Sequence, residues 1–171
     1  MRTLARDPAH RLRARIVASP EALARALGRE LGARVLAPSQ ADVEALAAEY
    51  VARAKRFAPG AAIVRAAEPS VTLRGRAGRG GRSTHLAALV ARDLPPGVTF
   101  AAIATDGVDG SSGTGGAIVD ARLARRTDLE AAIDAFDTGP LHVRAGTALP
   151  AAPSGHNLAD VHVLVRGSRG S

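Results

Sequence analysis

The 171-residue sequence contains no cysteine, so it forms no disulfide and holds no metal ion through thiolates. Aromatic residues make up only 2% of the chain, and the core must therefore be built from alanine, valine and leucine. No apolar run approaches the ~18 residues of a membrane span, and no apolar stretch follows the basic N-terminus as in a secretory signal. The histidines lack zinc-ligand spacing. We expect a cytoplasmic protein without membrane contact, zinc or haem.

Lysine is almost absent as well. The chain has 23 basic residues and a net charge of +7, but Lys55 is its only lysine. A basic balance favours anionic partners such as nucleic acid, nucleotides or phosphorylated metabolites, without choosing among them. RNA-binding Arg/Gly segments work with stacking aromatic residues, and none lies between Phe57 and Phe100. We therefore expect a small anionic metabolite and disfavour nucleic acid.

The order of apolar segments predicts one α/β domain at residues 13–166, after a polar lead-in at 1–12 and before a flexible tail at 167–171. Ser19 before Pro20 and Glu21 is typical of a helix start, and Thr127 with Glu130 forms a capping-box pattern. Strands are expected at 15–18, 34–36, 61–64, 71–73, 98–103 and 161–165, with further helices after Ser39 and at about 83–92. Strands that alternate with helices predict a layered sandwich with a mainly parallel mixed sheet flanked by helices.

Ligands of such sheets bind at loops beyond the carboxyl ends of strands. The first such loop, residues 74–83, contains Gly78, Gly80, Gly81 and Arg82 before a helix. Glycine amides, a helix N-terminus and a guanidinium together favour a phosphate or carboxylate, although the loop lacks a Walker motif. The alternative is a solvated Arg/Gly loop.

The second loop, residues 105–116, follows the most apolar strand. Its Asp106 and Asp109 are suited to hold Mg²⁺ or to accept hydrogen bonds from a polyol. The alternative is a pair of Asp-Gly turns whose carboxylates bond only the local backbone. The third loop, residues 151–160, carries Ser154, Asn157 and Asp160, for which a binding role and a turn role are equally consistent.

Together the loops resemble the MOFRL domain, the C-terminal domain of class II glycerate 2-kinases. The pattern of that family reads G-G-E-x-T-V, then G-x-G-x-G-G-R-N-Q-E, then G-T-D-G-x-D-G-P-T-D-A-A-G-A, then T-G-P-T-G-T-N-V-x-D. The corresponding segments here are Ala66-Ala67-Glu68-Pro69-Ser70-Val71, Gly80-Gly81-Arg82, Thr105-Asp106-Gly107-Val108-Asp109-Gly110, Gly116-Ala117, and Pro153-Ser154-Gly155-His156-Asn157 with Asp160. Order and spacing agree over about residues 60–166.

The resemblance implies phosphoryl transfer from ATP to glycerate with Mg²⁺, in a cleft between two α/β domains. Arg82 is then the catalytic residue that stabilises charge on the phosphoryl group. Asp106 and Asp109 are the implied metal ligands. With the residues that the loops themselves indicate, the candidate substrate- or phosphate-binding residues are Gly78, Gly80, Gly81, Asp106, Asp109, Ser154, Asn157 and Asp160.

The sequence also departs from the pattern. The Asn-Gln-Glu of the family is Ser83-Thr84-His85 here, and Gly113 replaces an aspartate. We expect the large N-terminal domain of the family, with its catalytic lysine, to be missing here. We expect a split kinase, completed either by a separate N-terminal domain or by a homo-oligomer. The alternatives are a non-catalytic domain that binds a small anion or nucleotide, and a protein-interaction module.

Overall fold

The computed structural model describes residues 16–73 and 75–168. The predicted lead-in at 1–12 and the end of the predicted tail, 169–171, lie outside these residues. The α-helices are α1 Pro20–Glu30, α2 Val43–Ala54, α3 Arg82–Asp93, α4 Leu129–Asp134 and α5 Thr138–Ala145, and Leu123–Arg125 forms a 3₁₀ turn, η1. The strands are β1 Arg34–Val35, β2 Ala62–Ala67, β3 Val98–Ala104, β4 Thr114–Asp120, β5 Ala148–Pro150 and β6 Asp160–Arg166.

The six strands form one mixed sheet in the order β1-β2-β6-β3-β4-β5. The predicted α/β class and mixed sheet are confirmed, but the expectation of mainly parallel pairing is wrong. Only β1 and β2 pair in parallel, whereas β2–β6, β6–β3, β3–β4 and β4–β5 are antiparallel. The cause is the last strand: β2 and β3 run in the same direction around the α3 crossover, as predicted, but β6 inserts between them in the opposite direction.

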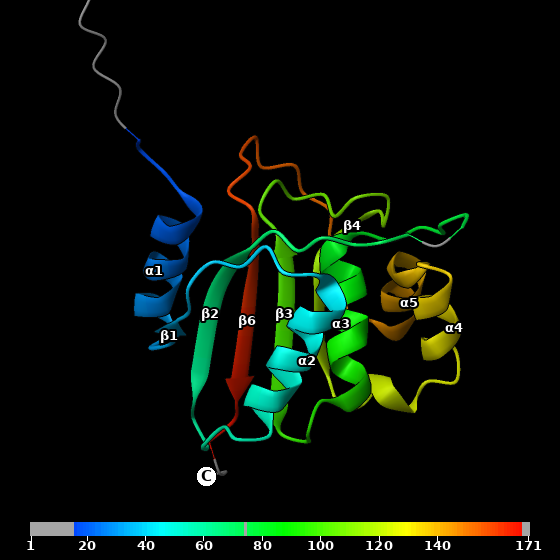
Figure 1. The fold of residues 1–171 in the computed structure, drawn as a ribbon, viewed down its shortest axis with the longest axis horizontal. Coiled ribbons are helices and arrows are strands. Elements are labelled where there is room, and N and C mark those ends of the chain that lie inside the picture. The colour runs from blue at the N-terminus through cyan, green and yellow to red at the C-terminus, as the bar shows by residue number, and fades with distance from the viewer. Residues whose placement is uncertain (1–15, 74, 169–171) are drawn as a thin grey trace, which may run out of the picture.

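This topology gathers particular chain ends at one edge of the sheet. The carboxyl ends of β2 and β3 and the amino ends of β4 and β6 lie together, because β6 pairs antiparallel with both β2 and β3 and β4 pairs antiparallel with β3. The loops at 105–113 and 151–159 extend above this edge in Figure 1. We call it the upper edge below.

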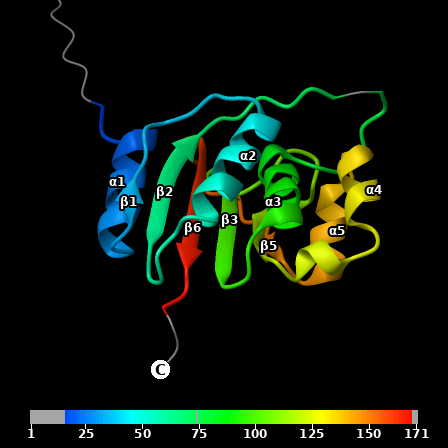
Figure 2. The ribbon, with the colours of Figure 1, turned by 60° about the horizontal axis from the view of Figure 1, so that its bottom comes forward.

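Helices cover the two faces of the sheet unequally. Helices α2, α3, α4 and α5 lie on one face, and α1 lies beside β1 and β2 (Figure 2). The main core fills the first face with large buried side chains such as Leu46, Leu86, Phe100 and Leu164. A smaller cluster joins α1 to the opposite face of β2 and β6. Helix α3 is central, since every residue from 83 to 91 is buried.

The helix starts agree only partly with the sequence signals. Ser19 caps α1 as predicted, because its Oγ accepts a hydrogen bond from the Ala22 amide. Helix α2 starts at Val43 rather than after Ser39, and Asp42 caps it. At α4 the N-cap is Asp128, and no side-chain capping bond forms, so the predicted capping box is wrong.

Several strand predictions also fail. Strands were predicted at 15–18 and 71–73, but the structure has none at 71–73 or in the described part of 15–18. Conversely, the strands β4 and β5 and the helix α5 were not predicted. Strand β4 begins with Thr114-Gly115-Gly116, and two adjacent glycines are more typical of a loop than of a strand. Gly116 has φ 129°, and a Cβ there would overlap the Ala102 carbonyl, so the glycine permits close pairing with β3.

Candidate functional site

The three predicted loops meet at the upper edge of the sheet. Glu68 follows β2, Thr105 follows β3, Asp160 opens β6, and Arg82 opens α3 directly beside them. The sequence separates these residues widely, and the antiparallel insertion of β6 brings them together. Glu68 belongs to the resembling segments but was not among the predicted site residues. Its signal in the sequence is its place directly after a buried strand.

Arg82 is held between two carboxylates. Its Nη1 donates to Oε1 of Glu68 at 3.2 Å, and its Nε lies 3.3 Å from Oδ2 of Asp160. The Arg82 side chain is 39% exposed, whereas that of Asp160 is only 5% exposed. Within the described residues, Nη2 of Arg82 makes no hydrogen bond. The guanidinium is therefore oriented by the protein and retains donors for an external anion.

Asp160 has an unusual protonation equilibrium. Burial raises its pKa from 3.8 to about 7, the charge of Arg82 opposes the rise, and Asp109, Asp106 and Glu68 add to it. Three further carboxylates therefore act on Asp160 at the upper edge, and Glu68 and Asp160 are the two that contact Arg82. A carboxyl group that titrates near neutral pH between charged neighbours is typical of functional sites, although ion-pair networks also produce it.

Asp109 is buried and caps α3 from outside the helix. Its Oδ1 accepts the Ser83 amide at 2.9 Å, and its Oδ2 accepts the Thr84 amide at 2.8 Å. A carboxylate at a helix N-terminus is stabilised by the amides and by the helix dipole. These two amides are consequently already bonded within the protein. An anion at this edge has to be bound mainly by Arg82.

The glycines of the first loop permit close packing within the protein. A Cβ on Gly81 would overlap the carboxyl group of Asp109. A Cβ on Gly80 would lie 2.7 Å from the Phe136 carbonyl, and one on Gly78 would lie 2.8 Å from Cβ of Asp137. The glycine pattern therefore has a structural cause that does not require a phosphate.

The second and third loops are bonded to each other. Oγ1 of Thr105 donates to the Ala159 carbonyl at 2.6 Å and accepts the Leu158 amide at 2.8 Å. Oγ of Ser154 donates to the Thr105 carbonyl at 2.6 Å, and the Ser154 amide donates to the Asp106 carbonyl at 3.0 Å. Ser154 thus uses its hydroxyl to join the loops, and Thr105 is a residue of this site that the sequence reasoning missed.

Asp106 and Asn157 lie exposed on these loops, and both form local turns. Oδ1 of Asp106 accepts the Val108 amide at 3.1 Å, and Oδ1 of Asn157 accepts the Ala159 amide at 3.3 Å. Ala159 has φ 62°, a conformation that costs a non-glycine residue roughly 1–2 kcal/mol. This strained residue directly precedes Asp160, the first residue of β6.

Magnesium binding stays a prediction for these residues. In the part of the chain that the structure describes, no three or more histidine, aspartate or glutamate side chains are grouped to hold a metal ion. Both oxygens of Asp109 are bonded to amides, so of the two predicted ligands only Asp106 presents its carboxylate at the surface. One carboxylate suits Mg²⁺ only when substrate phosphates complete the coordination.

The lysine lies far from the upper edge. Lys55 caps the C-terminal end of α2, while Asp42 at the other end of that helix contacts Ser70 of the segment after β2. The twelve residues of α2 span about 18 Å at 1.5 Å per residue. Lys55 is therefore no part of the site around Arg82.

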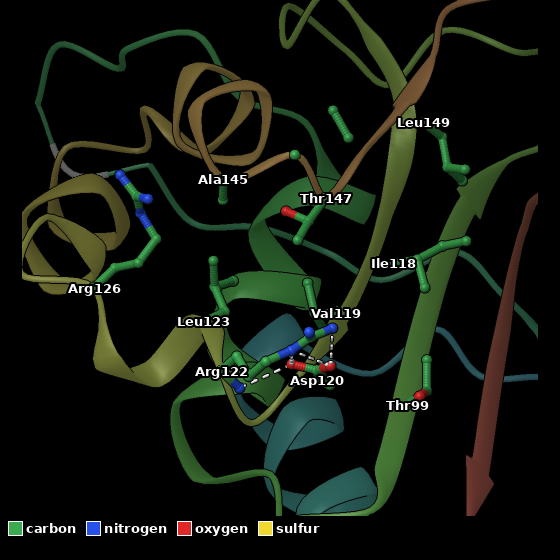
Figure 3. A pocket seen from close by; sticks show the side chains of 12 residues that line it. Thr99, Ile118, Val119, Asp120, Arg122, Leu123, Arg126, Ala145, Thr147 and Leu149 are labelled. Carbon is green, nitrogen blue, oxygen red and sulfur yellow. Dashed lines mark hydrogen bonds and ion pairs between the residues drawn. The ribbon is translucent and has the colours of Figure 1, made fainter. Parts of the chain in front are cut away.

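A cavity of about 600 Å³ lies beside β4, η1 and α5, and its lining side chains are drawn in Figure 3. It reaches Thr99 at the start of β3, opposite the end of that strand that leads into Thr105. Its Arg122 is bonded to Asp120, with Nη2–Oδ2 at 2.7 Å. None of the predicted site residues lines this cavity.

Known proteins match this chain both in sequence and in fold. The profile of the MOFRL family matches residues 61–160. The PH0495 protein from Pyrococcus horikoshii OT3 has a similar structure, with a TM-score of 0.80 and 22% identity over 90% of this chain and 39% of that one. A glycerate kinase from Thermotoga maritima has a TM-score of 0.73 and 23% identity over 82% of this chain and 38% of that one. No curated protein sequence matches significantly.

The two similar structures share the fold, and this chain spans about two-fifths of the length of each. Among the described residues, no helix combines the length and the apolarity that crossing a membrane requires. The family match covers more than half of the chain and includes β2, Arg82, the Thr-Asp-Gly-Val-Asp-Gly loop and Asp160. The chain therefore belongs to the MOFRL family.

Proposed function

We propose that this chain supplies one side of an active site that transfers a phosphoryl group from ATP to glycerate, and that a separate N-terminal domain or subunit supplies the other side. The observation that carries the proposal is the orientation of Arg82. Glu68 and the buried Asp160 hold its guanidinium at the upper edge and leave Nη2 without a partner among the described residues. The similarity to a glycerate kinase fold supports the choice of reaction.

Arg82 would bind the oxygens of the transferring phosphoryl group, where negative charge accumulates during transfer. Asp160 acts as a positioning residue, since it touches Nε of Arg82 and is itself buried. Phosphoryl transfer needs groups around both the attacking and the leaving oxygen. All the site residues of this chain lie at one sheet edge and its lysine lies elsewhere, so a second domain is required.

The other edge residues have roles that follow from their exposure. Asp106 would hold Mg²⁺ together with the phosphates of ATP, which lets the ion neutralise their charge. Asn157 is exposed on the adjoining loop, residues 151–159, and would bind the carboxylate or hydroxyls of glycerate. Asp109, Ser154 and the glycines shape the edge, because their polar atoms are bonded within the protein.

The test is ADP formation from ATP, Mg²⁺ and D-glycerate. The chain is assayed alone and mixed with the Thermotoga maritima glycerate kinase lacking the region that this chain matches. We expect turnover only in the mixture, with Arg82→Ala removing it. Arg25→Ala, a change at an exposed arginine on α1, should keep full turnover. Turnover that survives Arg82→Ala, or no ADP above that of the truncated enzyme, would overturn the catalytic proposal.

A non-catalytic domain that binds a small anion is the second candidate. The observation that favours it is Asp109, whose two carboxylate oxygens are both bonded to the Ser83 and Thr84 amides, so that only Asp106 of the two predicted metal ligands is exposed. Such a domain would bind a phosphorylated glycerate through Arg82 and give no turnover in the mixture. Binding and turnover measured on the same samples separate the two functions.

A further inference from the structure

A second cavity lies on the helical face of the sheet. It has a volume of about 430 Å³ and is bounded by the start of α2, by α3, by the end of α4 and by residues 71–73 and 76–77. Val43, Val71, Ile133 and Phe136 form its apolar wall. Neither Arg82 nor any other residue of the upper-edge site lines it, so it is a separate place for a ligand.

His85 lines this cavity and lacks polar partners. The residue is 6% exposed, its Nδ1 is buried, and neither ring nitrogen makes a hydrogen bond among the described residues. Its ring packs on Phe136 with 4.6 Å between centroids. Phe136 holds φ 53°, a left-handed conformation that disfavours a bulky residue. A buried polar group without a partner and a strained neighbour are both features of binding sites.

The imidazole is available as a hydrogen-bond acceptor. Burial lowers the pKa of His85 to about 4, and the charge of Asp42 opposes the change only partly. The ring is therefore neutral at neutral pH. One of its nitrogens then carries a lone pair, which a ligand N–H can satisfy.

The mouth of the cavity is acidic. Asp42, Glu44 and Asp134 line it with a single arginine, Arg76. No ion pair joins any of the three carboxylates to a basic side chain within residues 16–73 and 75–168. In a chain of net charge +7 this local excess of negative charge is unusual. It repels phosphates and carboxylates and attracts cations.

We propose that this cavity binds a small organic amine. The ammonium group donates to His85 and to the rim carboxylates Asp42 and Asp134, and the apolar body of the ligand packs against Phe136 and Ile133. The face of an aromatic ring adds attraction for the cation. The ligand is thus opposite in charge to the anion proposed at Arg82, and the two sites are independent.

The experiment titrates the full chain with three ligands of the same size: benzylamine, benzyl alcohol and benzoate. Nuclear magnetic resonance follows the ring signals of His85 and Phe136 at neutral pH. We expect saturable binding of benzylamine, about tenfold or more tighter than benzyl alcohol, which corresponds to one charge-assisted contact. Benzoate should not bind.

Two classes of variant test the contacts separately. His85→Phe should weaken the binding of benzylamine. The double variant Asp42→Asn with Asp134→Asn should keep the fold but lose the preference for benzylamine over benzyl alcohol. Asp120→Asn, at the cavity of Figure 3, is the matched control and should change nothing. If His85→Phe does not fold, the rim variants decide.

Three results would overturn the proposal. They are equal binding of benzoate and benzylamine, no saturable binding of benzylamine up to about 10 mM, and unchanged selectivity in the rim variants.

Discussion

Replacement of Asp160 by asparagine should change stability in a manner that depends on pH. Folding raises the pKa of this carboxyl from 3.8 to about 7, chiefly through burial. Between these values the unfolded chain gives up the proton while the folded chain retains it, so the free energy of unfolding falls as pH rises. At about 1.4 kcal/mol per pKa unit, the loss reaches about 4 kcal/mol above pH 7. The amide in Asp160→Asn does not ionise, so the free energy of unfolding of the variant does not fall in this way as pH rises.

Urea unfolding of wild type and Asp160→Asn from about pH 4.5 to about pH 8.5 measures the effect. The variant should gain several kcal/mol relative to wild type across this range, and most of the gain should appear below pH 7. Asp106→Asn is the matched control, because its carboxylate is exposed at the same edge. A difference between wild type and Asp160→Asn that is the same at every pH would refute the reasoning.

Further changes test other parts of the structure. Asp109→Ala should lower the free energy of unfolding by about 3 kcal/mol, because two buried amides of α3 lose a charged acceptor; a loss under about 1 kcal/mol in urea would contradict this. Gly107→Ala should lower the melting temperature clearly more than Gly60→Ala: both glycines have positive φ, but only at Gly107 would a Cβ overlap a facing carbonyl. Tyr50→Phe removes the 2.9 Å hydrogen bond to Nδ1 of buried His162 and should cost about 1–2 kcal/mol in urea unfolding, whereas unchanged stability would show that the bond contributes nothing.

The strands that the sequence predicts best are those with dense apolar residues. Strands β3 and β6 were recognisable because valine, leucine and isoleucine recur in them without glycine. Strand β4 was not, since it opens with Thr114-Gly115-Gly116, and its glycines make sense only beside β3. The directions of the strands were also not predicted correctly. The position of β6 between β2 and β3 depends on long-range pairing that no local pattern encodes.

The candidate site, like the strands, was predictable from the sequence only in part. Their places next to predicted strands or a helix, together with the family resemblance, singled out Arg82, Asp106, Asp109 and Asp160, and the structure brings these loops to one edge. The side-chain directions required the tertiary structure. Asp109 turns inward and caps α3, and Asp106 is exposed although it lies only three residues away. An aspartate before a glycine is compatible with either arrangement.

The most direct test of an anion site at Arg82 is calorimetric binding of 2-phosphoglycerate to the purified chain. Wild type and Arg25→Ala should bind alike. Arg82→Ala should bind roughly 10- to 100-fold more weakly, which corresponds to the ~1.5–3 kcal/mol of a charged hydrogen bond. Equal affinity of wild type and Arg82→Ala, or no saturable binding by wild type, would contradict the account.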